Sequence, residues 1–142
     1  MIELWVNGIP KAQPRPRAFA RGGRARVYDP STAEGWKGQI AMAMKSMRPS
    51  IPIDNPVEMQ VDFYLPRPQR LMKAKDPGGV IPHTAKPDID NLLKAVMDCI
   101  TQIGVWKDDT QVAKITSTKY YHAKIGRPGA LIRIREIGGD AA

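Results

Sequence analysis

Residues 57–65 read Val-Glu-Met-Gln-Val-Asp-Phe-Tyr-Leu, and apolar and polar side chains alternate along the whole stretch. Successive side chains of a strand point to opposite faces of a sheet, so this alternation predicts a strand with one buried face. Residues 2–6 and 129–137 alternate in the same way, and residues 111–122 do so more weakly. We therefore expect a sheet of about four strands.

Two other segments have the spacing of amphipathic helices. Apolar side chains recur every three or four positions in residues 31–47 and again in about residues 90–102. Ser31 and Glu34 have the spacing of a capping box, which predicts that the first helix begins there. Gly104 follows the second segment, and glycine is common just past the end of a helix.

These elements predict an α+β fold, with a mixed β-sheet of about four strands and two main helices. The length suits a single domain over residues 1–142, with only the last few residues flexible. The chain has no run of about 18 apolar residues, which a membrane span needs. Its one cysteine, Cys99, excludes an internal disulfide or a cysteine-rich zinc site. These absences favour a cytoplasmic protein with no membrane partner.

The distribution of charge separates one acidic segment from a basic chain. The formal net charge is +8 and the pI is about 9.8, which predicts a polyanionic partner such as a nucleic acid. Two long loops rich in proline and basic residues, at about residues 9–27 and 66–87, carry much of the excess. Residues 88–110 instead hold five acidic and two basic residues. Repulsion within such a segment needs a compensating feature, such as a bound cation.

Three acids of this segment are candidate metal ligands. Asp88 and Asp90 would point about 200° apart on one helix, but they converge if Asp88 lies in extended backbone and Asp90 begins the helix. Pro87 favours that arrangement because it disfavours a helical residue before it. Asp109 follows the helix after a short turn, which can bring it back toward the helix start. Carboxylates without histidine or cysteine suit Mg²⁺ or Mn²⁺.

Each of these residues also has a structural explanation when it is taken alone. Asp88 and Asp90 can be a helix cap and a partner of the helix dipole. Asp108 and Asp109 can form a turn, and Lys94 can pair with a carboxylate one turn away. The combination of all of them inside a basic chain favours a metal site.

A longer pattern around these acids resembles the RusA-type Holliday junction resolvases. It comprises Lys-Pro-Asp-Ile-Asp-Asn-Leu-Leu-Lys at residues 86–94, then Asp98, Gly104 and Trp106, then Asp-Asp-Thr-Gln-Val at residues 108–112. The resemblance implies a Mg²⁺-dependent, homodimeric endonuclease, in which Mn²⁺ can substitute, that nicks two strands of a four-way junction symmetrically. It implies that three acids bind the metal and act in catalysis, namely Asp88, Asp90 and Asp109. It also implies that Lys94 is a catalytic lysine.

The same resemblance gives the two basic loops a role on DNA phosphates, although any single arginine can equally be a solvated loop charge. The candidate DNA contacts are Lys11, Arg15, Arg17, Arg21, Arg24, Arg26, Arg70, Lys73, Lys75 and Lys86. The alternatives are a junction-binding protein without catalysis and, ranked last, a Mg²⁺-dependent nucleotide phosphohydrolase. His83, in the second loop, is a poor catalytic candidate.

Overall fold

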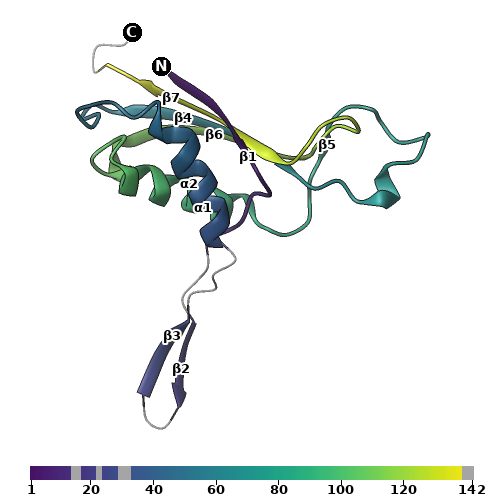
Figure 1. The fold of residues 1–142 in the computed structure, drawn as a ribbon, viewed down its shortest axis with the longest axis horizontal. Helices are drawn as coiled ribbons and strands as arrows, with labels where there is room; N and C mark the ends of the chain where they lie inside the picture. Colours follow the sequence, from purple (N-terminus) through teal and green to yellow (C-terminus); the bar gives the residue numbers. More distant parts are fainter. Residues whose placement is uncertain (14–16, 22–23, 29–32, 139–142) are drawn as a thin grey trace.

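The computed structural model describes residues 1–13, 17–21, 24–28 and 33–138 (Figure 1). A five-stranded sheet has the order β1-β7-β4-β6-β5. Its strands are β1 (Ile2–Asn7), β4 (Val57–Leu65), β5 (Ile81–Pro82), β6 (Val112–Tyr121) and β7 (Gly129–Glu136). The main helices are α1 (Glu34–Lys45) and α2 (Ile89–Ile103), and two short 3-10 helices are η2 (Gln69–Leu71) and η3 (Asp109–Gln111). A separate two-stranded sheet pairs β2 (Arg17–Arg21) with β3 (Arg24–Tyr28).

The central strand of the sheet is β4, which pairs antiparallel with β7 and parallel with β6. A parallel pair needs a long crossover connection, and the chain between β4 and β6 supplies it with a loop and α2. The predicted α+β fold with a mixed sheet is confirmed. The sheet has five strands rather than about four because β5, only two residues long, pairs with β6 at its edge.

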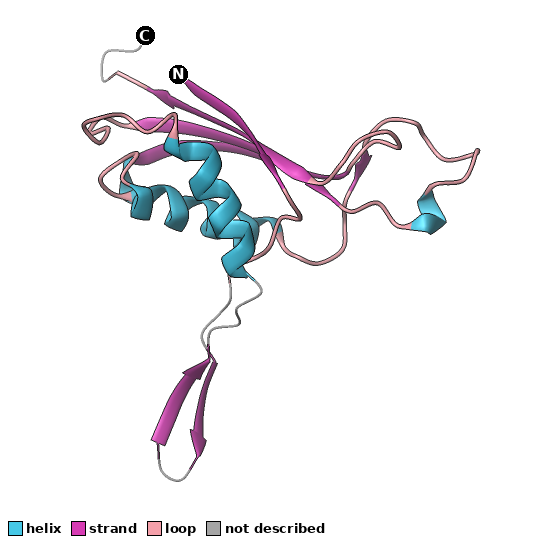
Figure 2. Cartoon of the chain, viewed as in Figure 1, coloured by secondary structure: helices cyan, strands magenta, loops and turns pink. Residues whose placement is uncertain are grey.

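The core lies between one face of this sheet and the two helices, which Figure 2 shows on the same side of it. Every second residue of β4 is buried, as the alternation predicts. The helices contribute Trp36, Ile40 and Met44 from α1, and Leu92, Val96, Cys99 and Ile100 from α2. The first helix was predicted to reach residue 47, but α1 ends at Lys45, and the side chain of Met47 is 43% exposed.

The first basic loop is not irregular throughout, since it contains the antiparallel strands β2 and β3. The sequence Gly22-Gly23 lies between them, and a glycine pair between two short strands favours a hairpin. The described part of this segment therefore includes two paired strands, which the loop prediction did not contain. The capping box predicted at Ser31 and Glu34 is wrong, because Ala33 is the N-cap residue of α1, Glu34 is its first residue, and no side chain caps it. Ser31 itself lies outside the described residues.

The second basic loop, residues 66–87, is organised around one buried arginine. The guanidinium of Arg67 donates hydrogen bonds to the carbonyl oxygens of Leu71 at 2.9 Å, Pro77 at 2.6 Å and Gly79 at 2.9 Å. The Arg67 side chain is 7% exposed, so these carbonyls replace the water that its charge would otherwise need.

In the described part of the chain, no helix is both long and apolar enough to cross a membrane.

Candidate active site

The first candidate acids lie where α2 begins. Asp88 is the N-cap residue, in extended backbone with φ −69° and ψ 145°, and Asp90 lies in the first turn. This is the arrangement that the sequence predicted for the two residues. Extended backbone at Asp88 followed by helix at Asp90 lets their side chains approach one point.

The carboxylate of Asp88 does not cap the helix at which it stands. Its side chain makes no capping hydrogen bond, although aspartate is a favoured N-cap residue. Both Asp88 and Asp90 are exposed, and neither forms an ion pair with a described residue. The ammonium of Lys94 lies 3.8 Å from the carboxylate of Asp98, one turn along α2, rather than near Asp90. The two acids are therefore free to bind something else.

Both acids line one cavity of about 610 Å³ between the start of α2 and β6. Its other lining residues are Pro82, His83, Ile89, Ser117, Thr118, Lys119 and Tyr120. A second cavity, of about 510 Å³, touches Asp88 from the side of Ala12, Lys86, Pro87 and Asn91. Asp88 thus stands between two hollows of the surface.

Basic residues from both predicted DNA-binding loops come close to Asp88. Lys86 lines the second cavity, and a third one of about 410 Å³ is lined by Lys11 as well as Lys86. The backbone amide of Gln13 donates to the carbonyl oxygen of Asn91 at 3.0 Å, which ties the chain before β2 to the first turn of α2. Two lysines and the segment that ends at Gln13 therefore adjoin the first turn of α2.

The other predicted DNA contacts lie further away or are only partly described. Arg70, Lys73 and Lys75 are exposed in the loop that contains η2, at the opposite end of the sheet from the chain termini (Figure 1). The structure describes the backbone of four arginines on the β2–β3 hairpin: Arg17, Arg21, Arg24 and Arg26. Arg15 lies outside the described residues.

The segment that leads into Asp88 is fastened to β6. Its β5 residues pair with Tyr121 and Tyr120, and the amide of His83 donates to the carbonyl oxygen of Lys119 at 2.9 Å. The Lys119 ammonium donates in turn to the carbonyl oxygens of Ala85 at 2.7 Å and Pro87 at 2.8 Å. The Lys86–Pro87 peptide within this segment is cis.

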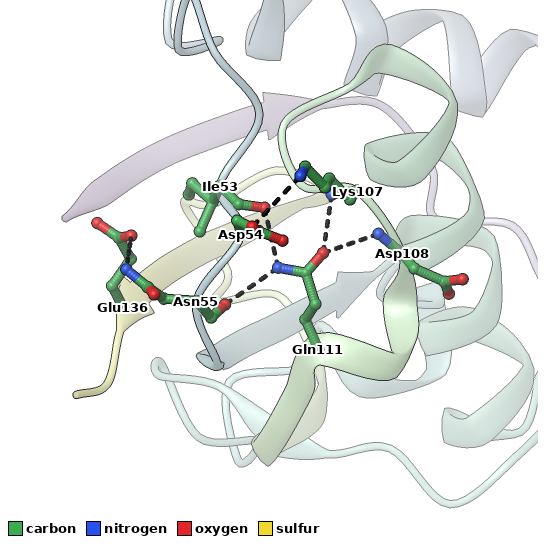
Figure 3. Close-up of polar contacts among 7 residues, drawn as sticks. All are labelled: Ile53, Asp54, Asn55, Lys107, Asp108, Gln111 and Glu136. Carbon is green, nitrogen blue, oxygen red and sulfur yellow. Dashed lines mark hydrogen bonds and ion pairs between the residues drawn. The ribbon is translucent and has the colours of Figure 1, made fainter. Parts of the chain in front are cut away.

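The second acidic pair is Asp108, the N-cap residue of η3, and Asp109, its first residue. Figure 3 shows the side chain of Gln111 holding the backbone at Asp108. The Gln111 Oε1 atom accepts from the amides of Lys107 and Asp108, both at 2.9 Å. Its Nε2 atom donates to the carbonyl oxygens of Ile53 at 2.9 Å and Asn55 at 3.0 Å. The carboxylate of Asp108 accepts from the amide of Thr110 at 3.1 Å, which completes a capping box.

These contacts move the pKa values of the two neighbouring acids in opposite directions. The backbone hydrogen bond from Thr110 is the main reason that the pKa of Asp108 is lowered. The pKa of Asp109 is raised, first by its side-chain interaction with Asp108, then by burial and by the charges of Asp108 and Asp98. Lys94 opposes that rise, so Asp109 lies within electrostatic reach of the middle of α2.

The structure therefore shows two acidic groups beside α2. Asp88 and Asp90 share a cavity at the start of the helix, while Asp109 neighbours Asp98 and Lys94 further along. Within the described residues, no group of three or more histidine, cysteine, aspartate or glutamate residues is gathered closely enough to hold a metal ion. Mg²⁺ is nevertheless commonly held by one or two carboxylates together with water and phosphate oxygens, and the free pair fits that chemistry.

Two residues of this site are absent from the candidates that the sequence suggested. Lys119 is one, because its part depends on contacts with residues more than thirty positions away. His83 was set aside, yet it is buried, lines the cavity and packs on Tyr121 with ring centroids 4.5 Å apart. Burial lowers the pKa of His83, and the nearby Lys119 charge lowers it further. The only local signal was a lysine beside two tyrosines in the strand with weak alternation.

Comparisons with known proteins agree on one family. A family model described as Endodeoxyribonuclease RusA matches residues 7–135. The uncharacterized protein YqaN of Bacillus subtilis (strain 168) is 34% identical, over 96% of this chain and 96% of YqaN. Crossover junction endodeoxyribonuclease RusA of Aquifex aeolicus (strain VF5) is 25% identical, over 94% and 90%. The enzyme of the same name from Escherichia coli (strain K12) is 25% identical, over 89% and 91%.

Proposed function

Since the chain belongs to the RusA family of endodeoxyribonucleases, we propose that it resolves four-way DNA junctions by Mg²⁺-dependent, paired nicking. The observation that carries the proposal is the pair of free carboxylates, Asp88 and Asp90, in one cavity of a basic chain. The relatives named crossover junction endodeoxyribonuclease support the choice of a four-way junction as the substrate.

In this proposal Asp88 and Asp90 hold the metal ion from their shared cavity, and Asp109 joins them as the third ligand when the ion is bound, because the three acids are not gathered in the described structure. When it is bound, Mg²⁺ supplies positive charge that polarises the scissile phosphate and favours attack by water. The raised pKa of Asp109 supports its inclusion, because a carboxylate crowded by Asp108 and Asp98 gains from a nearby cation. Mn²⁺, which accepts the same oxygen ligands, is expected to substitute for Mg²⁺.

Lys94 has a different part in the proposed reaction. Its ammonium is exposed and loosely paired with Asp98 at 3.8 Å, and it lowers the pKa of Asp109. It therefore helps keep Asp109 ionised. A long, exposed lysine can also turn toward the phosphate and offset the charge that develops in the transition state.

Basic residues around the cavity are proposed to bind the DNA backbone. Lys86 shares a cavity with Asp88, and Lys11 shares another cavity with Lys86. The segment up to the end of β3 and the η2 loop carry the other candidate contacts. If about six phosphates are neutralised, the logarithm of the binding constant should fall against the logarithm of salt concentration with a slope near −5. Replacing Lys86 with alanine should make that slope shallower by about one.

A homodimer is part of the same proposal. One metal site cuts one strand, and a twofold axis would present two such sites to the matching strands of a junction. Light scattering at assay concentration should give the mass of two chains. A fully active protein with the mass of one chain would contradict paired nicking by a dimer.

The direct test compares substrates with and without the metal. The protein is incubated with a fixed four-way junction, a fork and a linear duplex of matched length, in Mg²⁺ and in EDTA. We expect symmetric nicks in the junction with Mg²⁺, and little cleavage of the duplex. Tight junction binding without cleavage in Mg²⁺ would favour a binding protein, and cleavage of all three substrates at equal rates would contradict junction specificity.

A further inference from the structure

We infer that Lys119 is the residue that positions Asp88 for metal binding, by holding the backbone on which Asp88 is carried. The inference rests on the proposed function, because it concerns the same acids. It adds a residue outside the acidic pattern and outside the two basic loops. Lys119 is expected to touch neither DNA nor metal, so it is a positioning residue rather than a catalytic one.

The contacts of its side chain carry the argument. The Lys119 Nζ atom donates to the carbonyl oxygens of Ala85 at 2.7 Å and Pro87 at 2.8 Å. The second of these carbonyls belongs to the residue directly before Asp88. Hydrogen bonds from a charged donor are stronger than those between neutral groups, so two of them on one short segment restrict it substantially.

The main chain of Lys119 holds the other end of the same segment. Its carbonyl oxygen accepts from the amide of His83 at 2.9 Å. One residue therefore fixes residues 83–87 at both ends, through its backbone and its side chain. Residues 84–86 are exposed, so little side-chain packing fixes the position of this segment.

Lys119 is carried by a strand that pairs with the buried centre of the sheet. It lies on β6, opposite Phe63 of the central strand β4, and the Phe63 side chain is completely buried. The position of this strand is therefore passed to the residue before Asp88 through two hydrogen bonds, from the Lys119 ammonium to the carbonyl oxygens of Ala85 and Pro87. Catalytic groups must be held within fractions of an ångström, and small misplacements reduce rates strongly.

The pairing of Lys119 also explains how the acids remain available. Lys119 lines the same cavity as Asp88 and Asp90, yet it forms no ion pair with either of them in the described part of the chain. Its ammonium is occupied by carbonyl oxygens instead. A cation in that cavity would therefore meet carboxylates that no lysine has neutralised.

Lys114 provides a matched control on the same strand. It also extends from β6, but its ammonium pairs with Glu58 at 3.2 Å and does not line the cavity. Lys114→Met therefore removes one lysine charge and one contact of β6 without touching the segment before Asp88. A general effect of net charge or of strand stability would appear in both variants.

The test compares Lys119→Met, Lys119→Arg and Lys114→Met with the unaltered protein. Three quantities are measured: single-turnover cleavage of a four-way junction against Mg²⁺ concentration, junction affinity in Ca²⁺, and amide hydrogen exchange at Leu92 without metal. Leu92 is chosen because its amide donates to the carbonyl oxygen of Asp88. Asp90→Asn serves as the reference for a lost metal ligand.

For Lys119→Met we expect cleavage to fall by about 10- to 100-fold, as is typical for residues that orient a metal ligand. The half-saturating Mg²⁺ concentration should rise, exchange at Leu92 should quicken, and junction affinity should change by less than about threefold because no phosphate contact is lost. Lys119→Arg should recover most of the rate, and Lys114→Met should match the unaltered protein. Should the methionine variant not fold, Lys119→Gln carries the same expectations because it is too short to bridge both carbonyls.

Normal cleavage and normal Mg²⁺ dependence in a folded Lys119→Met protein would overturn the inference and leave the proposed function intact. Equal losses in Lys119→Met and Lys114→Met would overturn it too. Absence of metal-dependent cleavage in the unaltered protein would instead refute the proposed function. The exchange measurement at Leu92 still reports on the role of Lys119 in that case.

Discussion

The two acidic turns beside α2 have similar sequences and different structures. Asp88 and Asp108 each stand in extended backbone at the N-cap of a helix. Asp108 caps η3, whereas the side chain of Asp88 caps nothing. At the first turn, Lys119 holds the backbone before Asp88, and the carboxylates of Asp88 and Asp90 stay free. At the second, Gln111 holds backbone groups, and the carboxylate of Asp108 accepts the cap hydrogen bond. An aspartate whose carboxylate makes no structural hydrogen bond is the better candidate for a metal ligand.

The largest expected effect tests whether the free turn is the chemical one. Asp90→Asn should reduce junction cleavage by more than about 100-fold, since even changes to residues behind a metal ligand cost 10- to 100-fold. Junction binding should persist, because asparagine removes a negative charge from a DNA-binding surface. Cleavage is measured under single-turnover conditions in Mg²⁺, and affinity is measured in Ca²⁺.

Asp54→Asn is the control for this change. Asp54 is an exposed aspartate that pairs with Lys107 at 3.3 Å and does not line the cavity of Asp88. Its replacement should leave cleavage unchanged. Normal cleavage by Asp90→Asn would show that Asp90 is not part of the active site. The proposed difference between a metal-binding first turn and a structural second turn would then be wrong.

The second effect tests whether the other turn is structural. Gln111→Ala removes a side chain that makes four hydrogen bonds to backbone groups, so the free energy of unfolding should fall by about 2 kcal/mol. Chemical denaturation gives this value. Gln102→Ala, at an exposed position of α2, should change it by less than about 0.5 kcal/mol. Equal stabilities of the two variants would show that the hydrogen bonds of Gln111 around η3 do not stabilise the folded protein.

A smaller effect links the pKa of Asp109 to stability. Because the folded protein raises that pKa, ionised Asp109 disfavours the folded state at neutral pH. Asp109→Asn should therefore raise the melting temperature slightly at pH 7. The gain should disappear below the ordinary aspartate pKa of about 3.9, where Asp109 is protonated in both states.

The same variant should lose junction cleavage at pH 7, so stability and activity are expected to change in opposite directions. Melting is followed by circular dichroism from pH 3 to pH 8. A variant that is less stable than the unaltered protein at pH 7 would contradict the raised pKa of Asp109.

The smallest effect concerns the cap that Asp88 does not form. Asp88→Ala should change the free energy of unfolding by less than about 0.5 kcal/mol, although loss of an aspartate cap normally costs about 0.5–2 kcal/mol. Asp108→Ala, which does lose a cap hydrogen bond, should lower the melting temperature more. The reverse order would mean that Asp88 has a structural role in solution.

Local sequence patterns predicted the strands and helices that position the site. They did not predict the contacts between segments that are distant in the sequence. The alternation in residues 57–65 predicted β4, and helical spacing closed by Gly104 predicted α2 nearly to its ends. The free carboxylate of Asp88 and the capping one of Asp108 look alike in sequence, because the difference lies in what surrounds each turn.

The features that the sequence patterns did not predict have the same origin, because they depend on contacts between segments. The prolines before β2 and the glycines between β2 and β3 predict a loop, and they outweigh the short strand pattern of residues 17–28. Strand β5 is two residues long and is defined only by its pairing with β6. The contacts of Lys119 join residues more than thirty positions apart, and no periodicity in the sequence records such a contact.

Direct measurement of metal binding tests the central claim, that the free acids of the first turn hold the ion. Mn²⁺ is titrated into the protein without DNA by calorimetry or electron paramagnetic resonance. The Asp88→Asn/Asp90→Asn double variant should bind at least about tenfold more weakly than the unaltered protein, because ligand loss removes charge and oxygen donors together. Asp108→Asn should bind within about twofold of the unaltered protein, since its amide oxygen can still cap η3. Unchanged binding in the double variant, or an equal loss in Asp108→Asn, would contradict the account.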